Sequence, residues 1–226
     1  MYHNWDWPGA EREFRSAIAL NPGHATAHQW YGNFLSIMGR PEESLAEFSL
    51  AVSLDPLSSL KLAALGWSYY FMRNYDKAID ECRRALELDA DLVVAQCWLA
   101  QALEAKGDYE AALAAHEEGA RQSRRSPWTL GFLGHGYVSV GRVADAHRVR
   151  DELLELRGRR YVSGYDIAII YIALGDADAA LTWLEQAERD RAHQMAFLKV
   201  EPRLDPLRSC PASSASWTGW ASGRPK

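Results

Sequence analysis

Histidine and cysteine are the residues of this sequence whose side chains could hold a metal ion or act as nucleophiles. His24 and His28 are four positions apart, so a helix through them would place both imidazoles on one face. A zinc site needs a third and usually a fourth ligand, and the repeat pattern of the sequence supplies none. We therefore expect His24 in a turn and His28 in helix packing, with no metal and no other cofactor.

Nucleophilic catalysis is not indicated either. His116 and His147 have no serine or cysteine at a matching position that could complete a nucleophile–base pair. Cys82 falls at a packing position, where a small core residue is expected. The glycines of residues 131–136 lie inside a predicted helix, so they do not form a phosphate-binding loop. The residues that could do chemistry thus predict a protein that is not an enzyme.

The charge distribution argues against nucleic acid as a partner. The net charge of the 226 residues is -5, whereas nucleic-acid-binding proteins usually have a basic face. Two groups of arginines, in residues 121–125 and 157–160, fall near the C-terminal ends of predicted helices. Cations are favoured there by the negative end of the helix dipole, so we interpret both groups as helix-terminal charges.

Neither secretion nor membrane insertion is indicated. Residues 1–8 lack a charged stretch followed by an apolar run, as a signal peptide would have. No apolar run approaches the ~20 residues that a membrane helix needs. The three cysteines are an odd number without metal-binding spacing, which fits a reducing compartment. We predict a cytoplasmic protein that does not bind membranes.

The elements that position these residues follow one period along the chain. A small residue recurs at positions 32, 66, 100, 134 and 168, a constant step of 34 residues, and a second series recurs at the same step. We expect each pair of small residues to mark the close crossing of two helices, because a larger side chain there would push them apart. The two series are Gly32, Gly66, Ala100, Gly134 and Ala168, and Ser44, Ala78, Ala112, Ala146 and Ala180.

Glycines recur at the turn between the two helices of a period. Gly39, Gly107, Gly141 and Gly175 occupy this position, where a left-handed backbone closes the first helix. Arg73 stands there in one period. The predicted organisation is a half repeat in residues 1–24, five repeats in residues 25–58, 59–92, 93–126, 127–160 and 161–194 (together 25–194), a capping segment in residues 195–209 and a disordered tail in residues 210–226.

The period and its small residues resemble the tetratricopeptide repeat family over roughly residues 5–194. The resemblance implies an all-α fold, a right-handed α-solenoid of antiparallel helix pairs that form a superhelix. More narrowly, residues 5–14, 25–32, 161–163 and 197–209 look like the C-terminal repeats of bacterial signalling or regulatory proteins. There, such repeats often follow a winged-helix DNA-binding domain, a nucleotide cyclase or a Ser/Thr kinase domain. The unpaired first half repeat suggests a fragment, and the sequence after Cys210 suggests a change of reading frame.

The resemblance also implies a partner-binding surface on the first helix of each repeat, along the concave face. That face is aromatic and apolar in this chain, which suits an amphipathic helix or an extended peptide with large side chains. An acidic Glu-Glu-Val-Asp terminus is not expected, because lysine and arginine are missing from the matching positions. The alternative for Trp67, Phe71 and Trp128 is packing between repeats. The expected partner-binding residues are Gln29, Asn33, Trp67, Tyr70, Phe71, Gln101, Trp128, His135 and Tyr165.

The sequence therefore predicts a non-catalytic scaffold that binds a protein or peptide. The alternative is an intramolecular regulatory role, in which the repeats control an upstream DNA-binding, cyclase or kinase domain of the same protein. Self-association is also compatible with the pattern, because an unpaired first helix would leave apolar surface uncovered.

Overall fold

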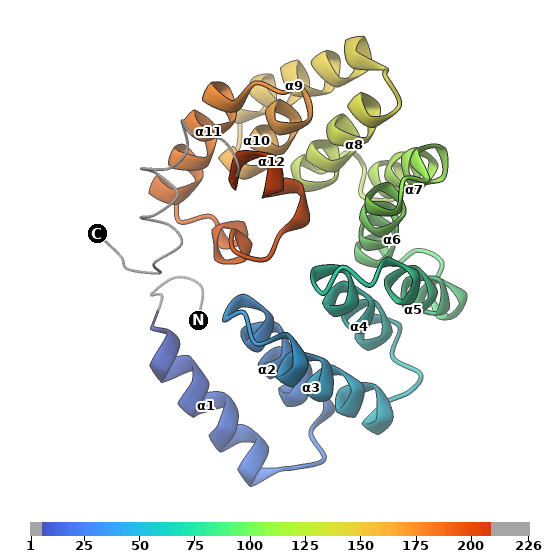
Figure 1. The fold of residues 1–226 in the computed structure, drawn as a ribbon, viewed down its shortest axis with the longest axis vertical. Helices are drawn as coiled ribbons and strands as arrows, with labels where there is room; N and C mark the ends of the chain where they lie inside the picture. The colour runs from blue at the N-terminus through green and yellow to red at the C-terminus, as the bar shows by residue number, and fades with distance from the viewer. Residues whose placement is uncertain (1–5, 209–226) are drawn as a thin grey trace. The chain divides into compact units, whose positions relative to one another are not determined.

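The computed structural model describes residues 6–208, which fall into two compact units divided between Lys106 and Gly107. All regular structure in the described residues is helical, with twelve α-helices, two short 3-10 helices and no strand. The expected all-α class is therefore confirmed (Figure 1). The predicted disorder of residues 210–226 and the change of frame near Cys210 lie outside the described residues.

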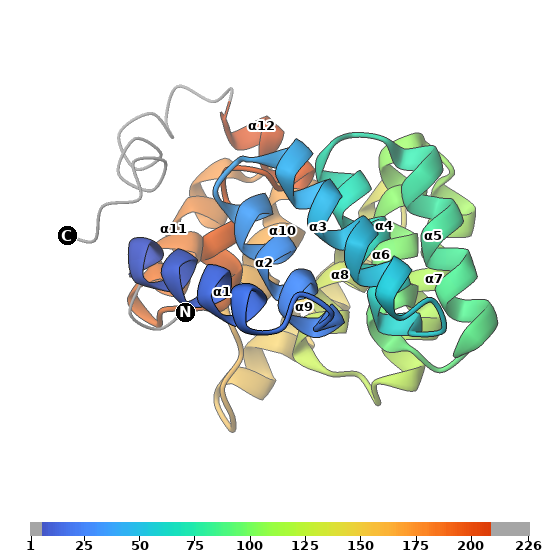
Figure 2. The ribbon, with the colours of Figure 1, turned by 90° about the horizontal axis from the view of Figure 1, so that it is seen from below.

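The first unit consists of helices joined by short turns, so that each runs back along the one before it (Figures 1 and 2). Helix α2 packs against α1 and α3, and α4 packs against α3, α5 and α6. These helices are α1 (Trp7–Leu20), α2 (Ala25–Ile37), α3 (Pro41–Leu54), α4 (Ser59–Phe71), α5 (Tyr75–Leu88) and α6 (Val93–Lys106).

The second unit repeats this arrangement and then departs from it. Helix α8 packs against α7, α9 and α10, and α10 packs against α11. The chain then continues through two 3-10 helices and a one-turn helix; η1 lies against α11, η2 lies against α10, and α12 lies against η2. The elements are α7 (Tyr109–Gln122), α8 (Pro127–Ser139), α9 (Val143–Arg157), α10 (Gly164–Ala173), α11 (Ala177–Arg189), η1 (His193–Phe197), η2 (Pro202–Leu204) and α12 (Asp205–Arg208).

The two histidines that could have shared a metal have separate structural roles. His24 caps α2, because its Nδ1 accepts a hydrogen bond of 3.0 Å from the Ala27 N–H. His28 is buried, with Nδ1 2.6 Å from a Glu47 carboxylate oxygen and Nε2 2.9 Å from the Pro22 carbonyl oxygen. The expected turn and packing roles are confirmed.

Small residues lie where consecutive helices approach each other most closely. A Cβ added to Gly66 on α4 would lie 2.8 Å from the Cys82 Sγ and 3.0 Å from the Ala78 carbonyl oxygen, both on α5. These distances are too short for a methyl group, so the prediction of a close crossing is confirmed here. In the preceding pair, the Ser44 hydroxyl donates to the Gly32 carbonyl oxygen at 2.9 Å.

Gly134 has a different neighbour from the expected one. A Cβ on Gly134 would lie 2.5 Å from the Ile170 Cδ1 on α10, and 3.4 Å from the Val149 Cγ1 on α9. The expectation that each small residue faces the second helix of its own repeat is therefore incomplete. On α8, the missing side chain makes room for α10 of the next helix pair as well.

The turn positions have the backbone conformation that the glycines suggested. Gly39, Gly107, Gly141 and Gly175 have φ values of 71°, 94°, 77° and 77°. Arg73 has a φ of 62°, in the left-handed region that costs a residue with a Cβ roughly 1 kcal/mol. The turn after α4 therefore keeps the shape of the other turns in spite of its side chain.

We predict opposite effects on stability from two turn substitutions. Arg73→Gly should raise the free energy of unfolding by about 1 kcal/mol, because it removes the left-handed penalty. Gly141→Ala should lower it by a similar amount through the backbone alone, since an added Cβ meets nothing within 4 Å. Urea denaturation followed by circular dichroism measures both; a stabilising Gly141→Ala would show that these turns do not impose the conformation.

Candidate protein-interaction surfaces

A stacked tryptophan pair dominates the expected binding face in the first unit. The rings of Trp67 on α4 and Trp98 on α6 are 4.9 Å apart between centroids and inclined by 10°. The Phe71 ring lies 4.6 Å from the Trp67 ring. All three side chains are partly buried. Two neighbouring helices thus jointly present an aromatic platform, which we define as Trp67, Phe71 and Trp98.

The other residues expected on this face of the first unit are buried. Gln29, Asn33, Tyr70 and Gln101 are between 1% and 7% exposed. The Gln101 side-chain amide donates to the Cys97 carbonyl oxygen of its own helix at 3.2 Å. Direct contact of these four side chains with a partner would therefore require the structure to open around them.

Trp30 and Trp98, which the sequence analysis missed, each lie one residue after a position of the expected binding face. Trp98 follows Cys97, and Trp30, 45% exposed, follows Gln29. The expected face used Gln29, which is buried, as is Cys97 at the same place two repeats later. Trp30 and Trp98 are two periods apart in the sequence, so their shared register was a signal that could have identified them.

In the second unit, a stretch of the chain itself covers part of the expected face. Tyr165 on α10 is 3% exposed and lies close to the charges of Glu201 and Arg203. The Arg203 guanidinium stands over the Phe132 ring of α8, 4.5 Å from its centroid. We call residues 192–208 the covering segment; its end is drawn in red beside α10 in Figure 1.

The remaining expected residues of this unit do not form one open surface. Trp128 packs edge-on against Phe132 on the same helix, with 5.1 Å between ring centroids. His135 is partly buried. This contact is within one helix, whereas the alternative stated for Trp128 above was packing between repeats. Tyr165 could meet a guest only after the covering segment had moved.

The covering segment holds its own buried ion pair. Arg203 and Glu201 form a two-pronged contact, with Nε–Oε1 and Nη2–Oε2 distances of 2.9 Å. Their side chains are only 8% and 4% exposed. The Arg208 guanidinium donates to the Glu201 carbonyl oxygen at 3.0 Å. These bonds give the segment a fixed shape, because charges taken out of water need such partners.

Asp166 on α10 is the titratable group beneath this segment. It is 3% exposed, and its Oδ1 accepts a hydrogen bond of 3.3 Å from the Gln194 amide of the covering segment. Burial raises the pKa of the Asp166 carboxyl to about 7, although Arg203 and the Gln194 hydrogen bond act in the opposite direction. The neutral carboxyl is therefore the favoured form up to near-neutral pH.

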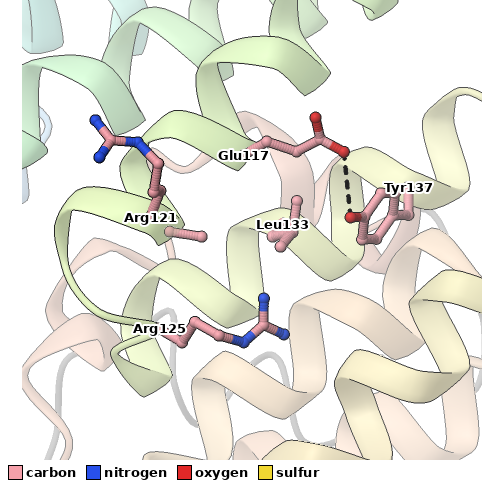
Figure 3. Close-up of a pocket in the computed structure, with 6 residues that line it drawn as sticks. Glu117, Arg121, Arg125, Leu133 and Tyr137 are labelled. Atoms are coloured by element: carbon pink, nitrogen blue, oxygen red, sulfur yellow. Dashed lines mark hydrogen bonds between the residues drawn. The ribbon is translucent and has the colours of Figure 1, made fainter.

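A separate recess lies between α7 and α8 in the second unit (Figure 3). It has a volume of about 340 Å³, and the Tyr137 hydroxyl donates to a Glu117 carboxylate oxygen at its edge at 3.2 Å. The Arg125 guanidinium is paired with Glu152 on α9. The charged side chains Glu117 and Arg125 of the recess are thus already paired, which disfavours an ionic ligand there. The lining residues are Glu117, Ala120, Arg121, Arg125, Leu133 and Tyr137.

The described part of the chain offers little for catalysis or metal binding. Within residues 6–208, no three His, Cys, Asp or Glu side chains are grouped so that they could hold a metal ion. Cys82 is fully buried, and burial raises the pKa of its thiol, which keeps it protonated and unreactive. No helix in this range is both long and apolar enough to pass through a bilayer.

Comparison with known families agrees with the helix pairs. Tetratricopeptide repeat models match residues 5–59, residues 60–92, and residues 93–118 together with 166–186. The chain belongs to the tetratricopeptide repeat family, whose members generally mediate protein–protein interactions.

Solved structures share the fold at low sequence identity. A tetratricopeptide repeat protein from Parabacteroides merdae has a TM-score of 0.66 and 17% identity, covering 81% of this chain and 72% of that one. YrrB, described as a TPR protein with an unusual peptide-binding site, has a TM-score of 0.51 and 20% identity, covering 82% and 96%. These likenesses confirm the α-solenoid class.

A curated relative matches part of the chain. Anaphase-promoting complex subunit 3 of Schizosaccharomyces pombe is 29% identical over 117 residues. The match covers 51% of this chain and 17% of that protein. The chain therefore corresponds to only a fraction of the length of this relative.

We predict that Asp166 makes the stability of the second unit depend on pH. Its pKa is higher in the folded state than in the unfolded state, so its favourable contribution is complete below about pH 4 and is lost as the pH rises through about 7. Asp166→Asn should therefore stabilise the protein at pH 8 by on the order of 2 kcal/mol and have little effect near pH 4.

Urea denaturation at several pH values measures this difference, with Asp178→Asn, at an exposed position of α11, as the control. An effect of Asp166→Asn that is equal at pH 5 and pH 8 would contradict the assignment.

Proposed function

We propose that this chain is a non-catalytic interaction module that binds a peptide or helix on the aromatic platform of its first unit. The observation that carries the proposal is the Trp67–Trp98 stack, which joins α4 and α6 and stays partly exposed. Large aromatic side chains supply much of the binding energy at protein interfaces, because they bury a wide area with little loss of conformational freedom.

The rest of the helix face supports an apolar or amphipathic guest. Trp30 and Leu60 are both 45% exposed on α2 and α4. Lys61, the lysine near the start of α4, is 8% exposed and paired with Asp55 at 3.0 Å. A guest held mainly by its carboxylates could not use Lys61, whereas leucine or aromatic side chains would find ring surfaces.

The relatives add support of a general kind. YrrB is described as having a peptide-binding site, and the fission-yeast relative is a subunit of a complex. We infer from these that this chain likewise serves as a scaffold. The repeats would divide as α2–α3, α4–α5, α6–α7, α8–α9 and α10–α11, in residues 25–194, with α1 as a half repeat and residues 195–209 as a cap.

A bacterial signalling or transcription-regulatory setting in the cytoplasm is the finer part of the proposal. It is supported by the resemblance of residues 5–14, 25–32, 161–163 and 197–209 described above. In that setting, the partner of the aromatic platform could be an upstream domain of the same polypeptide. Both versions use the same surface, so one set of variants tests the surface in either case.

We predict that the platform residues determine peptide affinity. Peptides selected from a random twelve-residue phage library against the whole chain should be enriched in tryptophan, phenylalanine and leucine. Trp67→Ala combined with Trp98→Ala should weaken the selected peptides at least tenfold, about 1.4 kcal/mol, as measured by fluorescence anisotropy.

Leu57→Ala is the matched control, because Leu57 is apolar and 79% exposed in the turn between α3 and α4, away from the stacked rings. It should leave the affinity unchanged. Tyr70 is unsuitable for this test, since it is 1% exposed and its loss would disturb the core. Equal affinity of the double variant and the native protein would rule out the platform.

A further inference from the structure

We propose that the covering segment is an internal ligand of the face formed by α8 and α10, and that an extended peptide with a Glu-X-Arg sequence between large apolar residues can replace it. This surface belongs to the second unit, so the inference is independent of the aromatic platform. Four observations carry it: the composition of the core, the form of the segment, its anchors and the chemistry of those anchors.

The second unit has a hydrophobic cluster that does not include the segment. Its central cluster is built from side chains of residues 113–170, with further apolar side chains packed against it up to Trp183. None of its members belongs to residues 192–208. The covering segment therefore lies on the helix pairs outside this cluster.

The segment has little regular structure of its own. Its elements are the 3-10 helices η1 and η2, of five and three residues, and α12, of four residues. Such short pieces have few backbone hydrogen bonds of their own, so side-chain contacts supply most of what holds the segment in place. By contrast, α8 and α10 are continuous helices of thirteen and ten residues.

The segment is attached to α8 and α10 by two polar anchors between buried apolar side chains. One anchor is the Arg203 guanidinium over the Phe132 ring, and the other is the Gln194 amide bonded to Asp166. Both anchors are side-chain contacts of the kind that a separate peptide could make equally well. The buried apolar side chains of the segment are Met195, Phe197, Leu198, Leu204 and Leu207.

The buried Glu201–Arg203 pair explains why the attachment can be specific without being strong. Removing two charges from water costs several kcal/mol, and their mutual attraction roughly returns that cost. Glu201 holds the guanidinium fork over the Phe132 ring, because both prongs of its contact with Arg203 are 2.9 Å long. A guest would need the same pairing, which defines the Glu-X-Arg requirement.

An internal ligand competes with any external one. A tethered segment acts at an effective concentration in the millimolar range, so a peptide added in solution binds the closed chain only weakly. Weakening the internal anchor should therefore strengthen the binding of a separate peptide. This inverse relation would not arise if the segment were an integral part of the fold.

Hydrogen exchange of the whole native protein tests whether the segment opens alone. After correction for intrinsic rates, amides of residues 192–208 should exchange at least tenfold faster than those in the middle of α10. Exchange of both regions at one common rate would overturn the proposal, because it would show that the segment opens only when the unit unfolds.

Binding of a labelled synthetic peptide of residues 192–208 to the full-length chain tests the face itself. Arg203→Ala in the protein should increase peptide affinity at least tenfold over the native chain. Phe132→Leu added to Arg203→Ala should reverse most of that gain, since the ring under the peptide arginine is removed while apolar volume is kept.

The matched control is Arg159→Ala, which removes an exposed arginine near the end of α9 and should behave like the native chain. Equal affinity of the native and Arg203→Ala proteins would overturn the proposal, as would loss of exchange protection throughout α8 and α10 in Arg203→Ala. The Trp67→Ala and Trp98→Ala pair should leave this binding unchanged, which separates the two surfaces.

Discussion

The close approach of paired helices is the constraint on which the rest of the structure depends. At Gly66, the backbone of α4 comes so near to α5 that a single methyl group would meet the Cys82 sulfur at 2.8 Å. Dispersion contacts between such closely packed surfaces are individually weak but numerous. The first helix of each pair packs against the second along one of its sides. The opposite side of the first helix is therefore available for contacts with other residues.

The two units use that remaining side differently. In the first unit it carries the Trp67–Trp98 stack, which keeps part of its area accessible to a guest. In the second unit the covering segment lies on it, with Arg203 over Phe132 and Gln194 bonded to Asp166. One type of surface is thus partly exposed in the first unit and covered by the chain itself in the second.

Features that repeat along the chain were predictable, and those that do not repeat were not. The turn glycines and the crossing at Gly66 follow from local backbone geometry and from a constant step, so they could be read from the sequence. Trp98 was missed because the expected face was placed one residue earlier, at the buried Cys97. A capping segment in residues 195–209 was predicted, but the contacts of Arg203 with Phe132 and of Gln194 with Asp166 are distant in sequence and follow no period, so no pattern predicted those contacts.

The most direct test of the helix crossing is a double-mutant cycle on Gly66 and Cys82, measured as the free energy of unfolding in urea. Gly66→Ala should cost about 1–3 kcal/mol by overpacking, and Cys82→Ala in the same chain should restore part of this loss, because it removes the nearest atom. The account predicts a favourable coupling energy of at least about 0.5 kcal/mol. Strict additivity of the two substitutions, or a harmless Gly66→Ala, would contradict it.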